Sequence, residues 1–304
     1  MSQRLVHSAG VRTPLGGRAV EFQTRKVRAG ALDLNVAEAG PVDGPLVILL
    51  HGFPEFWFEW RELIGPLAEA GFRVVAPDQR GYNLSDKPKG VDAYRLDLLA
   101  GDIFALAAAL GRDRFSVVGH DWGASVAWWM ATIRPQPIER LAIMNAPHPA
   151  VWKQAMTTDP EQRNKSRYVQ MLRIPALPEL MVRAGGYKGL SDAFASSPRP
   201  EAFTPQIMAR YQEAWRRPGA LTGGFNWYRA LFRAELAVPA KGSIGVPTLV
   251  LWGDQDPFAE AKLAEESAAL CASAEVVHFP HASHWLPHDE PDGVSQRLLA
   301  FLRG

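Results

Sequence analysis

The feature that most constrains the fold is a series of short, mostly apolar runs that alternate with helix-like stretches. The runs cover residues 46–50, 72–76, 115–118 and 141–144. Between the second and third runs, residues 96–110 carry leucine and isoleucine at helical spacing. Strands that are apolar on both faces and alternate with helices form a parallel sheet with helices on both sides. The chain is therefore predicted to have an α/β fold.

The alternation stops after Asn145 and resumes near the C-terminus. Residues 148–236 are rich in Trp, Arg, Met and Pro and contain no comparable β run, which predicts a helical lid inserted after the sixth strand. Strand-like runs at 247–252 and 274–278 then return the chain to the sheet. Residues 295–303 have the pattern of a closing amphipathic helix.

The N-terminal part completes the expected organisation. Residues 26–28 and 32–36, separated by Gly30, predict an opening β-hairpin. The segment before Val20 is polar, contains arginine and is interrupted by Gly and Pro, so a loose arm is expected there. The predicted units are an arm at 1–20, a core at 21–147 and 237–304 with a mostly parallel eight-stranded sheet, and a helical lid at 148–236.

A strand, a tight turn and a helix surround Asp121. The apolar run at 115–118 leads into Gly119-His120-Asp121-Trp122-Gly123, and small residues begin the following helix. Glycines are required where a turn is strained and the helix must approach the strand closely. The pattern is that of the nucleophile elbow of the α/β-hydrolase fold, with Asp in the place of the Ser of lipases and esterases. Taken alone, Asp121 also fits a simple helix N-cap.

Four further motifs accompany the elbow. They are His-Gly-Phe-Pro at 51–54, the run Asp-Gln-Arg-Gly-Tyr-Asn-Leu-Ser-Asp at 78–86, Trp-Gly-Asp-Gln-Asp-Pro at 252–257 and Pro-His-Ala-Ser-His-Trp at 280–285. With these motifs the chain, from about Glu21 onward, resembles the epoxide hydrolases of the α/β-hydrolase fold. The resemblance implies a catalytic triad in the chain order nucleophile, acid, histidine.

The resemblance also implies which residues form this triad. Asp121 is expected as the nucleophile and His284, which precedes an aromatic residue, as the histidine in preference to His281. Asp254 and Asp256 compete for the role of the acid, and the family's Gly-x-x-Asp spacing favours Asp256.

A carboxylate nucleophile is suited to attack at a saturated carbon. Asp121 would form an ester that water cleaves at its carbonyl, whereas Ser would leave a resistant ether. The backbone N–H groups of Phe53 and Trp122 are implied to bind the oxyanion of that hydrolysis, and one such donor is worth roughly 2.7–4 kcal/mol in serine enzymes. Epoxides and alkyl halides remain as substrate classes. An epoxide differs because it opens to an alkoxide, which needs an acid.

Two lid tyrosines are candidates for this acid. Tyr228 lies in Asn-Trp-Tyr-Arg at 226–229, which resembles the family's second-tyrosine motif, and Tyr168 lies seven residues before Pro175, where the first tyrosine belongs. A Tyr has an ordinary pKa of about 10, so it is protonated at neutral pH yet more acidic than the product alcohol. Either tyrosine alone also fits a packing role at a helix surface.

The main prediction is hydrolysis of an epoxide to a vicinal diol. Haloalkane dehalogenases are the first alternative, because they share the triad and the Trp122 position. These enzymes commonly place their second halide donor where this chain has Phe53, whose ring donates no hydrogen bond. The carboxylate-binding residues of fluoroacetate dehalogenases are missing. A non-catalytic protein that binds small molecules on the same fold is the second alternative.

The amino-acid composition limits the classes of partner that are expected for this protein. Lys and Arg number 33 against 32 Asp and Glu, without runs of like charge, so neither nucleic acid nor membrane insertion is expected. Cys271 is the single cysteine, which excludes an intrachain disulfide and favours a reducing, cytoplasmic location. A small apolar epoxide and water are the expected partners, and no cofactor or metal is expected. The sequence leaves open whether the protein forms a homodimer. Trp57, Trp227 and Leu172 are expected to line the substrate pocket.

Overall fold

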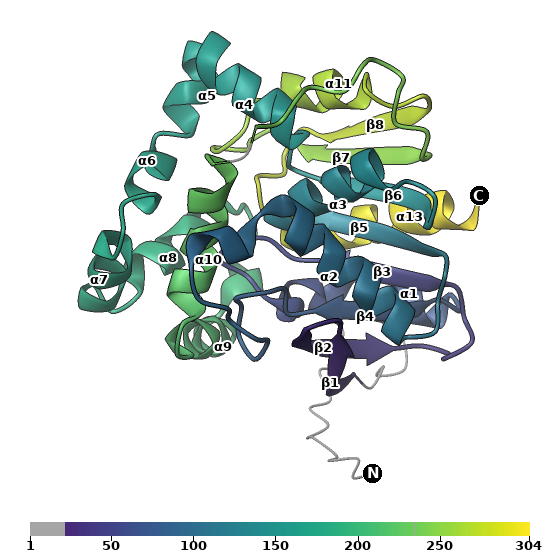
Figure 1. The fold of residues 1–304 in the computed structure, drawn as a ribbon, viewed down its shortest axis with the longest axis horizontal. Helices are drawn as coiled ribbons and strands as arrows, with labels where there is room; N and C mark the ends of the chain where they lie inside the picture. Colours follow the sequence, from purple (N-terminus) through teal and green to yellow (C-terminus); the bar gives the residue numbers. More distant parts are fainter. Residues whose placement is uncertain (1–21, 234) are drawn as a thin grey trace.

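A computed structural model describes residues 22–233 and 235–304, and its centre is one sheet of eight strands (Figure 1). The order across the sheet is β1-β2-β4-β3-β5-β6-β7-β8. β1 and β2 pair antiparallel with their neighbours, and the other pairs are parallel. The α/β prediction with a mostly parallel eight-stranded sheet is thus confirmed. The strands are β1 (Gln23–Ala29), β2 (Leu32–Ala39), β3 (Leu46–Leu50), β4 (Arg73–Pro77), β5 (Phe115–His120), β6 (Ile138–Met144), β7 (Thr248–Gly253) and β8 (Ala274–Phe279).

The N-terminal hairpin forms the antiparallel edge of the sheet. Ala29 of β1 pairs with Leu32 of β2, and Gly30 at the turn has φ +58°, a value that glycine adopts without steric cost. The arm expected at residues 1–20 lies outside the described residues.

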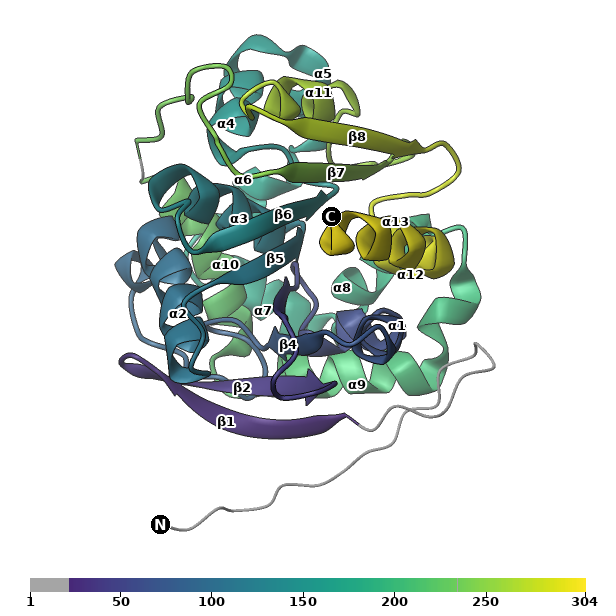
Figure 2. The ribbon, with the colours of Figure 1, turned by 90° about the vertical axis from the view of Figure 1, so that its right-hand side faces the viewer.

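Helices cover both faces of the sheet, which explains why its central strands are largely apolar. Figure 2 shows α2 and α3 on one face and α1, α12 and α13 on the other. Every residue of β3, β4 and β5 is buried. The core helices and 3-10 turns are η1 (Trp57–Glu62), α1 (Ile64–Glu69), η2 (Val91–Tyr94), α2 (Leu96–Ala109), α3 (Trp122–Ile133), α11 (Lys262–Ala268), α12 (Leu286–Asp289) and α13 (Pro291–Arg303).

A helical insertion separates β6 from β7 and gathers beside the sheet in Figure 1. Its described residues form helices and 3-10 turns without a strand between Pro149 and Arg233. Within the described ranges, no helix combines the length and the apolar character needed to cross a membrane. The insertion contains α4 (Pro149–Thr158), α5 (Pro160–Lys165), α6 (Tyr168–Leu172), α7 (Leu177–Ala184), α8 (Lys188–Asp192), η3 (Ala193–Ser196), η4 (Pro200–Phe203), α9 (Pro205–Arg216) and α10 (Ala220–Leu231).

Close packing around the elbow explains its two glycines. A Cβ on Gly123 would lie 1.9 Å from the carbonyl oxygen of Leu50, and one on Gly119 would lie 2.6 Å from the backbone nitrogen of Ala124. Both contacts are with main-chain atoms, which cannot turn away as a flexible side chain can. The first turn of α3 therefore sits directly against β3 and β5, and this fixes the position of Asp121.

Gly123→Ala is expected to lower the free energy of unfolding by about 1–3 kcal/mol or more, because the new methyl group overlaps Leu50. Gly101→Ala is the matched control. Gly101 is an exposed residue of α2 whose Cβ would meet no atom within 4 Å, so alanine there should stabilise the helix by about 1 kcal/mol. Urea denaturation measures both changes. Equal stability of Gly123→Ala and the parent protein would contradict the close contact.

Candidate active site

Asp121 occupies the strained turn between β5 and α3. Its φ of +50° and ψ of −120° lie outside the common regions for a residue with a side chain, as at many functional turns. The side chain caps no N–H group of α3, which argues against a simple N-cap. Instead, the N–H group of Phe53 donates to Asp121 Oδ1 over 2.7 Å. A Cβ on the neighbouring Gly52 would lie 2.5 Å from that of Asp121, so a glycine there allows this approach.

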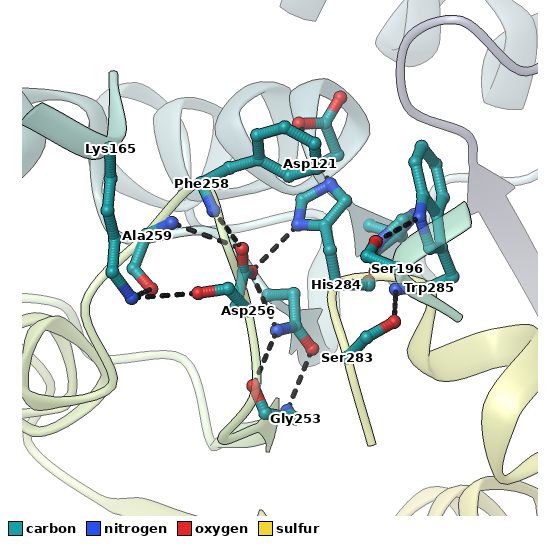
Figure 3. Close-up of polar contacts among 12 residues, drawn as sticks. Asp121, Lys165, Ser196, Gly253, Asp256, Phe258, Ala259, Ser283, His284 and Trp285 are labelled. Carbon is teal, nitrogen blue, oxygen red and sulfur yellow. Dashed lines mark hydrogen bonds and ion pairs between the residues drawn. The ribbon is translucent and has the colours of Figure 1, made fainter. Parts of the chain in front are cut away.

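The structure brings His284 and Asp256 to the nucleophile position. His284 follows β8, and Figure 3 shows its ring between the two aspartates. Its Nδ1 lies 2.8 Å from Asp256 Oδ2, and its Nε2 lies 3.5 Å from Asp121 Oδ2. Asp254, the competing acid, instead contacts His278 Nδ1. The arrangement is that of a nucleophile, a base and an acid that orients the base.

The carboxylate of Asp256 is held by a set of donors in the loop after β7. Oδ1 accepts hydrogen bonds from the N–H groups of Phe258 and Ala259, at 2.7 and 3.1 Å. Burial by itself would raise the pKa of Asp256, but the charge of His284 and these hydrogen bonds lower it below its ordinary value. Asp256 is therefore ionised and keeps Nδ1 of His284 protonated.

Asn145 also holds Asp256, a role that the sequence pattern did not reveal. Its Nδ2 donates to Asp256 Oδ2 over 2.9 Å, and its Oδ1 accepts from the N–H group of Gly253 over 3.0 Å. Asn145 directly follows β6 and has φ +44°. An isolated Asn after a strand carries no sequence signal, because the contact forms only when β6 and β7 pair.

The helical insertion is anchored to the same loop by Gln162 and Lys165 of α5. Lys165 Nζ donates to the carbonyl oxygen of Asp256 over 2.8 Å, as Figure 3 shows. Gln162 Nε2 donates to the carbonyl oxygen of Phe258 over 3.0 Å, and its Oε1 accepts from the N–H group of Glu260 over 2.8 Å. The insertion is thus connected directly to the segment that presents the acid.

The two carboxylates beside His284 favour the protonated, cationic form of its ring. Burial by itself lowers its pKa, but the carboxylates of Asp256 and Asp121 raise it to about 10. Two of these raising effects come from Asp121, one through its charge and one through a hydrogen bond. A reaction that removes the charge of Asp121 would therefore make His284 a stronger proton donor and let it become a neutral base.

Both lid tyrosines face Asp121 across one cavity. Tyr168 begins α6 and Tyr228 lies in α10, and their rings are 6.3 Å apart and nearly perpendicular. Burial and the nearby charge of Asp121 raise the pKa of Tyr168, although 37% of this residue is exposed. Burial likewise raises the pKa of Tyr228, so both hydroxyl groups remain protonated donors at neutral pH.

The cavity holds about 530 Å³ of empty space, including the part that is open to solvent. Its lining combines the carboxyl ends of the strands with the insertion: Asp121, Trp122, Ser125, Asn145, Ala146, Pro147, Pro149, Trp152, Tyr168, Val169, Tyr228, Leu231, Phe258, Ala259 and His284.

Trp57, Trp227 and Leu172, expected in the pocket, are not among these lining residues. Trp227 is buried behind Trp122 and donates its indole N–H to the carbonyl oxygen of Arg80 over 3.0 Å. Trp57 packs against other aromatic rings of the core, and Leu172 is buried in the insertion. The apolar lining comes instead from side chains such as Trp152, Val169, Leu231 and Phe258.

Comparisons with known proteins agree with this geometry. A family model described as alpha/beta hydrolase fold matches residues 45–291. The chain is 45% identical over 277 residues to AB hydrolase superfamily protein YfhM of Bacillus subtilis, covering 91% of this chain and 96% of that protein. It is 37% identical over 274 residues to Epoxide hydrolase 2 of Caenorhabditis elegans, covering 88% of this chain and 77% of the relative.

Solved structures extend the comparison. An epoxide hydrolase described from metagenomes of hot environments superposes with a TM-score of 0.81 at 36% identity, covering 93% of this chain and 99% of that one. The epoxide hydrolase of Bacillus megaterium, solved with an inhibitor, gives a TM-score of 0.83 at 28% identity, covering 92% of this chain and 100% of that one. The chain therefore belongs to the α/β-hydrolase family, among the epoxide hydrolases of that fold.

Proposed function

We propose that this protein hydrolyses a small, largely apolar epoxide to a vicinal diol through an ester on Asp121. The observation that carries the proposal is the joint placement of Asp121, His284, Tyr168 and Tyr228 around one cavity. A carboxylate and two phenol groups on opposite sides of a small cavity suit a substrate that must be attacked at carbon and protonated at oxygen.

In the first step, Asp121 Oδ2 attacks an epoxide carbon and the C–O bond of the ring breaks. Oδ1 stays with the N–H group of Phe53, which already holds it at 2.7 Å. Tyr168 and Tyr228 donate to the epoxide oxygen, and one of them transfers its proton to the alkoxide. The products of this step are an Asp121 ester, a neutral hydroxyl group and a tyrosinate.

In the second step, His284 is deprotonated and activates water. Loss of the Asp121 charge removes two of the effects that keep the pKa of His284 near 10, and its proton restores the neutral tyrosine. Neutral His284 then takes a proton from water, which attacks Cγ of Asp121. The oxyanion on Oδ1 is stabilised by Phe53 N–H and by the N–H group of Trp122 at the start of α3. Collapse breaks the bond between Cγ and the ester oxygen, which takes the proton from His284 as the diol leaves. The Asp121 carboxylic acid that remains then passes its proton to His284, which restores the carboxylate and the protonated histidine.

Phe53 also bears on the choice of substrate class. Its ring packs against Phe225 and Tyr228, with centroid distances of 5.5 Å to each. The phenyl ring of Phe53 carries no N–H group that could donate a hydrogen bond to a departing halide. The two tyrosine hydroxyl groups, in contrast, match the need of an alkoxide, so epoxide hydrolysis is favoured over dehalogenation.

Replacing either tyrosine tests this assignment. Tyr228→Phe and Tyr168→Phe are each expected to lower kcat/KM for an epoxide by about 10²-fold, since each removes a donor to the developing alkoxide. Tyr187→Phe is the matched control, because Tyr187 stacks on Trp215 and does not line the cavity. Initial rates of diol formation measure the effect. Unchanged rates in both cavity variants would remove the tyrosines from the mechanism.

A paired assay separates the substrate classes. Diol formation from styrene oxide and bromide release from a bromoalkane are measured on the same preparation. The proposal expects diol without bromide. Bromide release without diol would make the protein a dehalogenase, and no turnover of either compound would support a binding role.

A further inference from the structure

A second group of titratable side chains lies buried directly behind Asp121. Glu55 and Glu59 follow the His51-Gly52-Phe53 loop, and His120 is the last residue of β5. All three side chains are fully buried. Glu55 accepts hydrogen bonds from Tyr211 and pairs with His288, which accounts for one of its oxygens. The mechanism above uses none of these groups.

The contacts of His120 require a proton between it and Glu59. His120 Nε2 lies 2.8 Å from the carbonyl oxygen of His284, and because a carbonyl only accepts, Nε2 carries a hydrogen. In a neutral ring, Nδ1 then has a lone pair, yet Glu59 Oε1 lies 2.9 Å away. Among the described residues, both atoms would be buried without a hydrogen-bond partner if neither carried a proton. Such a pair of facing acceptors would be strongly destabilising.

The neighbouring charges favour Glu59 rather than His120 as the group that holds this proton. Burial and the carboxylate of Glu55 raise the pKa of Glu59 well above its ordinary value. Burial and the charge on His284, whose ring centroid is 4.9 Å away, lower the pKa of His120. The charge of Asp121 further opposes a second negative charge on Glu59. A neutral carboxyl group on Glu59 that donates to a neutral His120 satisfies the contacts of Glu59 and His120, and of this group of side chains only Oε2 of Glu55 stays without a partner among the described residues.

We infer that Glu59 is a positioning residue whose protonated carboxyl group ties together the three backbone segments of the reaction centre. Its Oε2 accepts from the N–H group of Gly52 over 2.9 Å, next to the Phe53 N–H that binds Asp121. Its Oε1 donates to His120, which precedes the nucleophile and holds the carbonyl group of His284. Glu59 thus acts on the oxyanion loop, the elbow and the histidine loop at once. This inference rests on the proposed function.

A bound metal ion is the competing explanation. One ligand atom from each of Glu55, Glu59 and His120 lies within 4.8 Å of the others, a spacing that a cation could bridge. The 2.9 Å separation of Glu59 Oε1 and His120 Nδ1 is an ordinary hydrogen-bond length, and a single proton accounts for it. The proton is therefore the simpler occupant.

Substitution of Glu59 separates these possibilities through kcat. Glu59→Gln replaces the O–H donor by an N–H donor of similar shape and keeps the acceptor for Gly52, so kcat should stay within about threefold of the parent value. Glu59→Ala removes both contacts and should lower kcat by about tenfold to a hundredfold. Glu62→Gln is the matched control from the same turn, since Glu62 pairs with Arg199 away from the site. If Glu59→Gln is as impaired as Glu59→Ala, the protonated state is wrong, and if neither is impaired, the positioning role is wrong.

Infrared spectroscopy tests the same point without turnover. The difference spectrum between the parent protein and Glu59→Gln should contain the C=O stretch of a protonated carboxylic acid. A carboxylate band in its place would overturn the inference, as would a stoichiometric metal in elemental analysis that disappears in Glu59→Gln. If the parent protein shows the acid band but opens no epoxide, the proposed function fails while the proton assignment stands.

Discussion

Asp121→Ala is expected to lower kcat/KM for an epoxide by on the order of 10⁵-fold, because removal of a covalent nucleophile abolishes both steps of the reaction. Alanine cannot form the ester, and the remaining cavity only binds the substrate. The remaining rate of diol formation, measured by chromatography, should be close to the uncatalysed rate in buffer. Thermal unfolding of the variant checks that the elbow still folds.

Asp254→Asn is the control for this substitution. Asp254 is another aspartate at a strand end, but its carboxylate contacts the partly exposed His278 rather than His284. Its replacement should leave kcat/KM nearly unchanged. A large loss in Asp254→Asn together with residual turnover in Asp121→Ala would contradict the assignment of both residues.

His284→Gln is expected to stop the reaction at the ester, because glutamine cannot take a proton from water. Hydrolysis should slow by about 10²–10⁴-fold while attack by Asp121 continues. Mass spectrometry of the peptide that contains Asp121 then measures the trapped species. An epoxide opens without expelling a group, so the adduct should add the mass of the whole epoxide. A haloalkane would add its mass less that of the hydrogen halide.

The exposed His281 provides the matched control, three residues away on the same loop. His281→Gln should turn over normally and accumulate no adduct. Steady diol formation by His284→Gln would show that another base activates water. An adduct on a residue other than Asp121 would remove the nucleophile assignment.

Local patterns predicted the strands and the elbow because their causes are local. The continuous apolar run at Leu46–Leu50 forms β3 with the same bounds, since a strand buried on both faces favours apolar side chains. The glycines at 119 and 123 predicted the elbow, because a tight strand-to-helix turn excludes a Cβ at both positions. β6 (Ile138–Met144) begins earlier than the apolar run at 141–144 predicted, because Glu139 and Arg140 are only partly buried and interrupt the apolar pattern.

The pocket lining depends on contacts between distant segments, and here the expectation for Trp227 failed. Its indole N–H finds the carbonyl group of Arg80, and its ring packs behind Trp122. Phe258 lines the cavity instead, two residues after the acid and beside His284. Which side of α10 faces the cavity is set by its packing against the core, and periodicity within the helix does not specify that direction.

By itself, the sequence determined the α/β architecture, the elbow and the residue types of a carboxylate-based reaction, because strand burial and turn geometry act over a few neighbouring residues. The resemblance already favoured Asp256 over Asp254 as the acid, and the structure places Asp256 against His284. The contact of Asn145 with Asp256 and the contact of Glu59 with His120 could not be predicted before the tertiary structure was known. Hydrogen bonds and buried charges act over a few ångströms in space, and these partners are brought together only by the pairing of the strands and the docking of the insertion.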